Sequence, residues 1–284
     1  MKILKTISVC LGAVLLSACT QVKFAAVNAP TYFDDVKVLS DVSYGEHDRH
    51  RLDVYSPKVA SLDAPVVVFF HGGRWTDGDK SYYRFVGSHL AKHGYVVVVP
   101  NYRTYPDVKF PTFVEDTAQA IAWVSENISQ YGGDATRINL MGHSSGAHMA
   151  ALVAADTRYL RVFDKMPAVI NSVVGLSGPY DFTPREADLV DMFGPPENFP
   201  NMVVTNFIDG DEPPVFLLWG GDDTLVGAQN INRLSARILE KGGAVDTKIY
   251  EGIDHVGTIA AFTWAYLGKS DIADDVLKFL EQEN

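Results

Sequence analysis

A serine flanked by glycines is the first feature of this sequence that could do chemistry. Residues 142–146 read Gly-His-Ser-Ser-Gly, the pattern G-x-S-x-G. An apolar run over 137–142 predicts a strand before it, and a helical stripe over 145–155 follows, which is the context of a nucleophile elbow. The pentapeptide alone also occurs by chance. In this context it predicts Ser144 as a nucleophile, with the backbone N–H of Ser145 placed to stabilise an oxyanion at the helix start.

A serine hydroxyl needs a general base, and the sequence offers eight histidines. In this type of site the members of the triad follow one another along the chain as serine, acid and histidine. His255, in a loop directly after the last predicted strand, follows both Ser144 and a pair of acids. His143 is expected to point away from Ser144, because the elbow turns adjacent side chains apart, and His148 to pack beneath the elbow. His255 is therefore the predicted base.

The candidate acid lies in the loop after the seventh predicted strand, where Asp222 and Asp223 are adjacent. A carboxylate there would accept the Nδ1–H of His255, hold the productive tautomer and stabilise the imidazolium. Two adjacent side chains cannot both point at one imidazole, so one aspartate is expected to be a solvated loop residue. The residue types alone leave the choice between them open.

Two glycines after the third predicted strand could complete an oxyanion site. Gly72 and Gly73 follow His71 at the position from which such sites receive their second backbone donor. Glycine lets the backbone approach a substrate oxygen closely. The alternative is a tight turn with no catalytic role. With Ser144 and His255 in the expected order, we predict the oxyanion role.

The elements that must position these residues alternate along the chain. Continuous apolar runs at 65–71 and 95–100 predict strands that are covered on both faces. Six more strands are predicted over 36–44, 51–55, 137–142, 170–176, 214–219 and 245–250, and helices over 82–93, 114–128, 145–155, 228–241 and 272–281. The pattern predicts the α/β class, with a mostly parallel eight-stranded sheet and helices on both faces.

The segment 180–213 interrupts this alternation. It holds five prolines, many acids and several aromatic residues without a clear period. Long segments of this kind are usually functional lids or disordered. We predict a small cap inserted between the sixth and seventh strands; the alternative is a surface excursion without a catalytic role.

Composition limits the classes of function. The 284 residues are 47% hydrophobic and carry a net charge of −11, which indicates a globular protein and disfavours nucleic acid as a partner. The two cysteines, Cys10 and Cys19, both lie near the N-terminus, which excludes a cysteine nucleophile or a zinc–thiolate site in the body. No His-Glu-x-x-His, P-loop or G-x-G-x-x-G pattern occurs, so we predict no metal and no cofactor.

The N-terminus has the features of an export signal. Lys2 and Lys5 precede an apolar run over 7–16 that is too short to span a bilayer. Residues 16–19, Leu-Ser-Ala-Cys, resemble the lipobox of bacterial lipoproteins, which implies cleavage before Cys19 and its lipidation. An ordinary signal peptide with a chance cysteine is the alternative.

These features divide the chain into a signal peptide over 1–18, a tether over 19–34 and a folded body over 35–284. Thr20, rather than an aspartate, follows the cysteine, which in lipoproteins usually implies the outer membrane. We therefore expect an exported lipoprotein that its lipid anchor holds on the outer membrane, facing the periplasm or the cell surface.

The body resembles α/β-hydrolases, close to the carboxylesterases that include hormone-sensitive-lipase-like and kynurenine-formamidase-like enzymes. The matching motifs are HGGRW at 71–75, NYR at 101–103, FPTFVED at 110–116, GHSSGAH at 142–148, GDD at 221–223 and GIDH at 252–255. The family pattern Gly-x-x-Asp-x-x-Val maps onto Gly220, Asp223 and Val226, which implies Asp223 as the acid. Arg74 stands where the lipase-like branch has a third glycine, so the chain is more similar to the formamidase-like and small-ester branch.

The resemblance implies a serine hydrolase of small carboxylic esters that forms an acyl-enzyme on Ser144, with Asp223 and His255. An amide hydrolase of the arylformamidase or peptidase kind uses the same triad and stays open. A hydrolase-fold protein that only binds a ligand is disfavoured, because the triad and the oxyanion glycines are all present. The expected partners are a small ester or amide substrate and, through the lipid, a membrane.

We expect Cys19→Ala to move the protein from the membrane fraction to a soluble or unprocessed form, because each buried CH₂ of an acyl chain contributes about 0.8 kcal/mol. The activity of the purified body should not change. Detergent partitioning of the variant like that of the wild type would contradict the lipobox interpretation.

Overall fold

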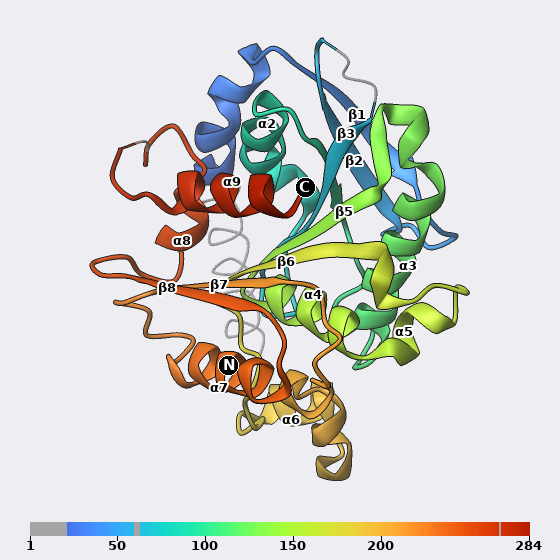
Figure 1. Ribbon diagram of the computed structural model, residues 1–284, viewed down its shortest axis with the longest axis vertical. Helices are drawn as coiled ribbons and strands as arrows, with labels where there is room; N and C mark the ends of the chain where they lie inside the picture. The colour runs from blue at the N-terminus through green and yellow to red at the C-terminus, as the bar shows by residue number, and fades with distance from the viewer. Residues whose placement is uncertain (1–21, 60–62, 267) are drawn as a thin grey trace, which may run out of the picture.

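The strands form a central sheet in the computed structural model, which describes residues 22–59, 63–266 and 268–284 (Figure 1). They are β1 (Val36–Ser43), β2 (Arg51–Pro57), β3 (Ala64–Phe70), β4 (Val96–Pro100), β5 (Gly133–His143), β6 (Ile170–Leu176), β7 (Val215–Gly220) and β8 (Val245–Tyr250). Their order is β1-β2-β4-β3-β5-β6-β7-β8. β2 is antiparallel to both its neighbours, and the other pairs are parallel. The predicted mostly parallel eight-stranded sheet is confirmed.

The central strands are apolar throughout because both faces of the sheet are covered. In β3, the side chains of Val66, Val68 and Phe70 enter the core on one face. Those of Val67 and Phe69 enter the core on the other face, and none of the five is exposed. Successive side chains of a strand point to opposite faces, so a strand that contributes to two cores cannot show polar alternation. The edge strands β1 and β8, by contrast, keep several exposed residues.

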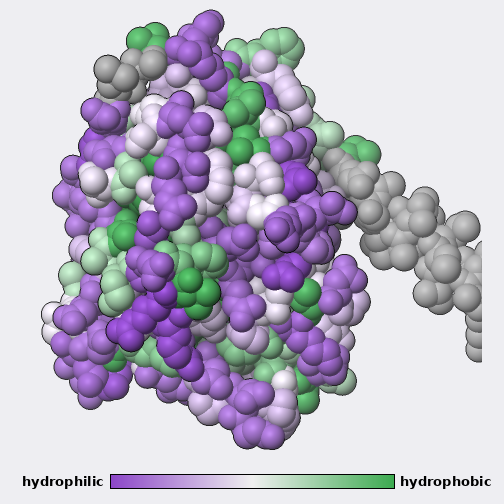
Figure 2. All heavy atoms as spheres, turned by 90° about the vertical axis from the view of Figure 1, so that its right-hand side faces the viewer, coloured by the Kyte–Doolittle hydropathy of each residue, from purple (hydrophilic) through white to green (hydrophobic). Residues whose placement is uncertain are grey.

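Helices pack on both faces of the sheet, as predicted (Figure 1). One face carries α3 (Thr112–Asn127), α4 (Ser145–Ala155), α5 (Thr157–Arg161) and α7 (Gln229–Lys241), and the other carries α2 (Arg84–Lys92), α8 (Gly257–Ala260) and α9 (Ile272–Glu283). The surface on the right-hand side of that view is mainly hydrophilic, with hydrophobic side chains in small scattered groups (Figure 2). Among the helices that the structure describes, none combines the length and the apolar character of a membrane span.

The segment 180–213, predicted as a cap, joins β6 to β7 through short helical pieces. These are α6 (Ala187–Phe193), η5 (Pro196–Asn201) and η6 (Val204–Asn206). The buried ring of Phe193 packs edge-on against Trp75, with ring centres 4.9 Å apart. The imidazole of His148 bonds through Nε2 to the Met202 carbonyl at 2.7 Å, which ties the segment to α4 beneath the elbow. Pieces this short show no sequence period, which is why the pattern did not reveal them.

The tether predicted over 19–34 is wrong for its described part, because residues 22–34 contact the body. Residues 22–28 are helical, and η1 (Ala29–Phe33) follows. The ring of Phe24 stacks on Tyr82 at 4.7 Å. The buried Asn28 amide donates to the carbonyls of Ser81 and Tyr82, each at 3.0 Å, and its oxygen accepts from the Phe85 N–H at 3.0 Å. Cys19 and the predicted signal peptide lie outside the described residues.

We expect Asn28→Ala to lower the free energy of unfolding by about 1–3 kcal/mol, because the Phe85 N–H at the start of α2 loses its acceptor. Asn198→Ala is the matched control: this asparagine is exposed, so its loss should change stability by less than about 0.5 kcal/mol. Urea denaturation measures both. Equal stabilities for the two variants would mean that residues 22–34 do not stabilise the body.

Candidate active site

The site lies where the order of strands along the chain reverses. From β3 the chain continues to β4 on one side, whereas β5 lies on the other side of β3 and leads on to β6. Loops that leave two neighbouring parallel strands in opposite directions open a crevice at the carboxyl ends of those strands. Gly72 and Gly73 follow β3, and Ser144 follows β5. The topology therefore brings the predicted oxyanion loop and the predicted nucleophile together.

The turn from β5 to α4 holds Ser144 in an unusual backbone conformation, with φ 55° and ψ −123°. Its N–H donates to the Leu176 carbonyl at 2.9 Å. A side chain on Gly146 would collide with the Phe70 carbonyl of β3, and one on Gly142 would lie 2.5 Å from the Ala147 nitrogen. Both glycines are therefore required by close approach of the backbone, and the turn presents the hydroxyl at the carboxyl edge of the sheet.

The structure brings Ser144, His255 and Asp223 into one hydrogen-bonded chain. His255 Nε2 lies 2.9 Å from Ser144 Oγ, and His255 Nδ1 lies 2.7 Å from Asp223 Oδ2. Since a carboxylate only accepts, Nδ1 carries a proton and Nε2 is free to accept the hydroxyl proton of Ser144. His255 and Asp223 are 8% and 7% exposed, so little water competes for these bonds. The three residues come from the loops after β5, β7 and β8.

Asp223, rather than Asp222, faces the imidazole. Its other oxygen, Oδ1, accepts from the N–H groups of Leu225 and Val226, each at 2.9 Å. Burial raises the pKa of Asp223, but these backbone bonds and His255 outweigh burial and leave the pKa below its ordinary value. Asp222 is exposed, and its backbone N–H donates to the Ile253 carbonyl at 3.0 Å. The loop therefore holds a charged carboxylate on His255.

The predicted oxyanion residues lie close to Ser144. A methyl group on Gly72 would lie 3.1 Å from the Ser144 Cβ, which places this loop directly against the nucleophile. Gly73 lines the cavity in front of Ser144. Ser145 opens α4, and the first N–H groups of a helix have no carbonyl partner within the helix. The backbone of the 72–73 loop and the start of α4 therefore both lie beside Ser144, as the predicted oxyanion role requires.

Residues of the NYR and FPTFVED motifs support the loop that carries Gly72 and Gly73. The Tyr102 hydroxyl donates to the His71 carbonyl at 2.8 Å, and its ring stacks on the His71 imidazole at 4.5 Å. Arg103 pairs with the buried Asp116 at 2.6 Å, which ties the loop after β4 to α3. These residues support the backbone before Gly72.

Sequence reasoning missed one contact of the triad. The His143 side chain bonds to the loop of the base: its Nε2 lies 3.0 Å from the backbone carbonyl of His255. Burial lowers the pKa of His143 to about 3, and the neighbouring His255 adds to this effect. The spacing of 112 residues gives no sequence signal for such a contact.

A cavity of about 570 Å³ opens in front of Ser144 and His255. Its apolar walls include Trp75, Tyr83, Phe182, Leu189, Leu225 and Val226. Arg74 stands at the mouth, where its guanidinium pairs with Glu186 and Asp188 of the cap. The residue that departs from the glycine-rich pattern thus links the oxyanion loop to α6. Such walls suit a small organic group beside a polar reacting centre.

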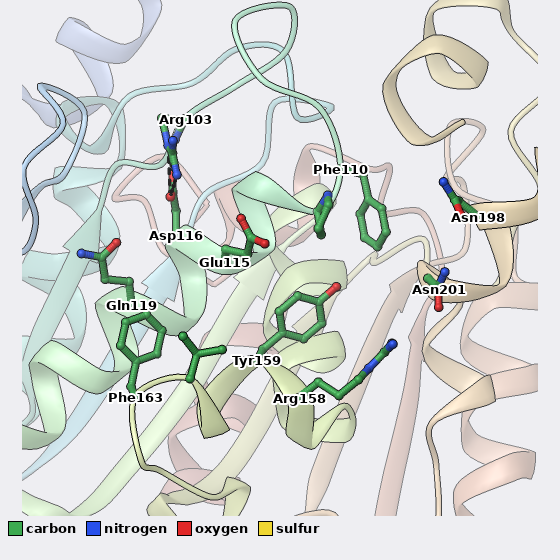
Figure 3. Close-up of a pocket in the computed structure, with 12 residues that line it drawn as sticks. Arg103, Phe110, Glu115, Asp116, Gln119, Arg158, Tyr159, Phe163, Asn198 and Asn201 are labelled. Carbon is green, nitrogen blue, oxygen red and sulfur yellow. Dashed lines mark hydrogen bonds and ion pairs between the residues drawn. The ribbon is translucent and has the colours of Figure 1, made fainter. Parts of the chain in front are cut away.

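A second cavity, of about 580 Å³, lies between α3, α5 and η5 and does not include the triad. Figure 3 shows Arg103 and Asp116 pointing toward each other at its edge, with Tyr159 and Phe110 among its walls. Within the residues that the structure describes, no three histidine, cysteine or acidic side chains are placed to hold an ion.

The chain is similar in sequence to proteins named as ester hydrolases. The isoprenylcysteine alpha-carbonyl methylesterase ICME of Arabidopsis thaliana is 28% identical over 97% of this chain and 68% of its own length. The probable carboxylic ester hydrolase LipM of Mycobacterium tuberculosis is 33% identical over 66% of this chain and 49% of its own length. The chain thus spans about half to two thirds of such curated relatives.

Solved structures show the same fold. An inhibited esterase B from Lactobacillus rhamnosis superposes with a TM-score of 0.77 at 22% identity, over 95% of this chain and 96% of the other. A truncated carbohydrate esterase from gut microbiota gives a TM-score of 0.75 at 22% identity, over 87% and 96%. The α/β-hydrolase fold inferred from the motifs is confirmed. The BD-FAE family model matches residues 52–238, which include the oxyanion loop, the elbow and Asp223, and the chain therefore belongs to the BD-FAE family.

Proposed function

We propose that this protein is a serine hydrolase of small carboxylic esters that works through an acyl-enzyme on Ser144. The observation that carries the proposal is the unbroken hydrogen-bonded chain from Asp223 through His255 to Ser144. Relatives named as methylesterase and carboxylic ester hydrolase support an ester as the substrate. Because those proteins are longer than this chain, their names support an ester as the class of substrate and no particular ester.

In the first half of the reaction, Ser144 Oγ attacks the ester carbonyl carbon while His255 Nε2 accepts the hydroxyl proton. The carbonyl oxygen becomes an oxyanion, which the backbone N–H groups of Ser145 and of the 72–73 loop stabilise. Asp223 stabilises the imidazolium that forms. The C–O bond to the alcohol then breaks, and His255 gives its proton to the departing alkoxide.

In the second half, water replaces the alcohol. His255 Nε2 accepts a proton from water as the water oxygen attacks the acyl carbon, and the same donors stabilise the second oxyanion. Collapse releases the carboxylic acid and returns the proton to Ser144. An amide would follow the same steps with an amine as the leaving group, so relative rates must decide between the two substrate classes.

We further propose that the protein is an exported lipoprotein anchored through Cys19, at the outer membrane. The support is the Leu-Ser-Ala-Cys sequence at 16–19 after a basic and apolar segment. Cys19 lies outside the described residues. Since contacts with the body begin by Phe24, a lipid on Cys19 would keep the body close to the membrane surface.

Ser144→Ala should lower turnover of short p-nitrophenyl esters by at least about 10⁴-fold, because the acyl-enzyme cannot form. Folding should be unaffected, since both glycines of the elbow remain. A fluorophosphonate should label the wild type and not the variant. Labelling of the variant at the wild-type level would contradict the assignment of the nucleophile.

The substrate class has a test of its own, in which the wild type is given an N-formyl aromatic amide and a set of short esters. Faster hydrolysis of the amide than of any ester would replace the esterase proposal with an amidase.

Asp223→Asn should lower kcat by about 10⁴-fold, because an amide at this position favours the wrong tautomer of His255. Asp222→Asn is the matched control one residue away; its exposed side chain does not contact the triad, so kcat should stay within about threefold of the wild type. Circular dichroism should show both variants folded. The opposite ranking would move the acid to Asp222, and equal mild losses would place it elsewhere.

A further inference from the structure

His143 connects the two loops whose side chains react with each other. It lies between Gly142 and Ser144 at the end of β5, and its side chain is buried. Its ring centre is 4.9 Å from that of His255, and its Nε2 lies 3.0 Å from the His255 carbonyl oxygen. The nucleophile and the base are therefore joined by a contact that does not involve the reacting atoms.

The chemistry of the partner fixes the protonation of His143. A backbone carbonyl only accepts, so Nε2 must carry the proton that it donates. The other nitrogen, Nδ1, has no hydrogen-bond partner among the described residues, and it lies 2.9 Å from where a Cβ on Gly72 would stand. A second proton there would put a buried charge beside the oxyanion loop without an acceptor, which is costly. His143 is therefore a neutral donor with one defined tautomer.

The His255 carbonyl accepts a second bond, from the Thr258 hydroxyl at 2.9 Å. That bond lies within the loop of His255 itself, three residues on, and cannot fix the loop relative to Ser144. The His143 bond runs instead to the elbow, 112 residues away in the chain. Loss of His143 would thus leave the carbonyl with a partner but would release the loop from the nucleophile.

The reaction removes one of the two side-chain bonds that hold the imidazole, since only the bond to Asp223 remains once Ser144 is acylated. While the acyl group occupies Ser144 Oγ, the serine has no proton to donate, and the Ser144–His255 bond that holds the imidazole at the start is lost. His255 must nevertheless stay in place to activate water. A misplacement of about 1 Å can cost about 10²-fold in rate. The bond from His143 to the His255 backbone is independent of the state of Ser144.

We propose that His143 is a positioning residue that holds the base His255 at reacting distance from Ser144 through its Nε2–H bond to the His255 carbonyl. This inference rests on the proposed serine-hydrolase function. His143 touches no reacting atom and acts through His255. It is required in both half-reactions and most of all in deacylation, when the serine no longer holds the imidazole.

The test compares variants that keep or remove the donor. His143→Phe keeps a ring of similar size but has no N–H, and kcat should fall about 10- to 100-fold with KM changed less than about threefold. His143→Asn also lacks a donor at the required reach and provides a second loss variant if His143→Phe does not fold. His143→Gln carries its amide nitrogen at the same number of bonds from Cβ as Nε2. It should restore kcat to within about fivefold of the wild type.

A matched control separates positioning from packing. His148 is also buried, is also bonded through Nε2 to a carbonyl, and lies in the first turn of α4. His148→Phe should lower the melting temperature while the rate of fluorophosphonate labelling changes less than about threefold. Labelling of His143→Phe should slow by more than about threefold but by less than its kcat, because labelling reports only the first half-reaction. Equal effects of the two substitutions on labelling would overturn the proposal.

The double variant with His255→Ala makes the test decisive. The single variant His255→Ala keeps the backbone carbonyl but has no base, so adding His143→Phe to it should not slow its residual labelling further. A further tenfold loss would mean that His143 acts directly on the reaction, and the proposal would be wrong. Wild-type rates in His143→Phe alone would also overturn it. Absence of labelling in the wild type would instead contradict the proposed function, so the two failures are distinguishable.

Discussion

The close contact between Gly146 and the Phe70 carbonyl is the constraint on which the site depends. It allows the start of α4 to lie directly against the end of β3, so that the elbow and the oxyanion loop share one small volume. Any side chain at Gly146 would push the two apart. Holding Ser144 at a positive φ costs about 1–3 kcal/mol, and such a conformation persists only when the surrounding structure fixes it. The buried strands and α4 provide that support.

The loops of the triad hold one another through backbone groups as well as through the reacting side chains. The Ser144 N–H donates to the Leu176 carbonyl at the end of the neighbouring strand β6, and the Asp222 N–H donates to the Ile253 carbonyl in the loop of His255. His143 adds a bond from the elbow to His255. Preorganised donors stabilise a transition state only if they do not have to move during the reaction. These backbone hydrogen bonds keep the loops that carry Ser144 and His255 in place.

The cap contacts the oxyanion loop and α4, and the N-terminal segment contacts α2 on the other face of the sheet. Arg74 links the oxyanion loop to α6, while Phe193 and Met202 fasten the cap to Trp75 and His148. Arg74 and Asp188 are both 42% exposed, so their pair contributes little to stability and chiefly fixes the geometry of the cavity mouth. On the other face of the sheet, Asn28 completes the hydrogen bonds at the start of α2.

The sequence by itself determined the class of fold and predicted Ser144 as the nucleophile. Strand and helix periods and the turn chemistry of 142–146 are local properties, set by residues within a few positions of one another. The order of Ser144 and His255 along the chain also needed no coordinates. Tertiary structure decided between the two acids on physical grounds, because it shows which carboxylate is buried and bonded. It also decided the contact of His143 with His255, the short helices of the cap, and the docking of residues 22–34. The cap helices are too short to show a period, and the other features depend on contacts between residues far apart in the chain, which leave no period or spacing in the sequence.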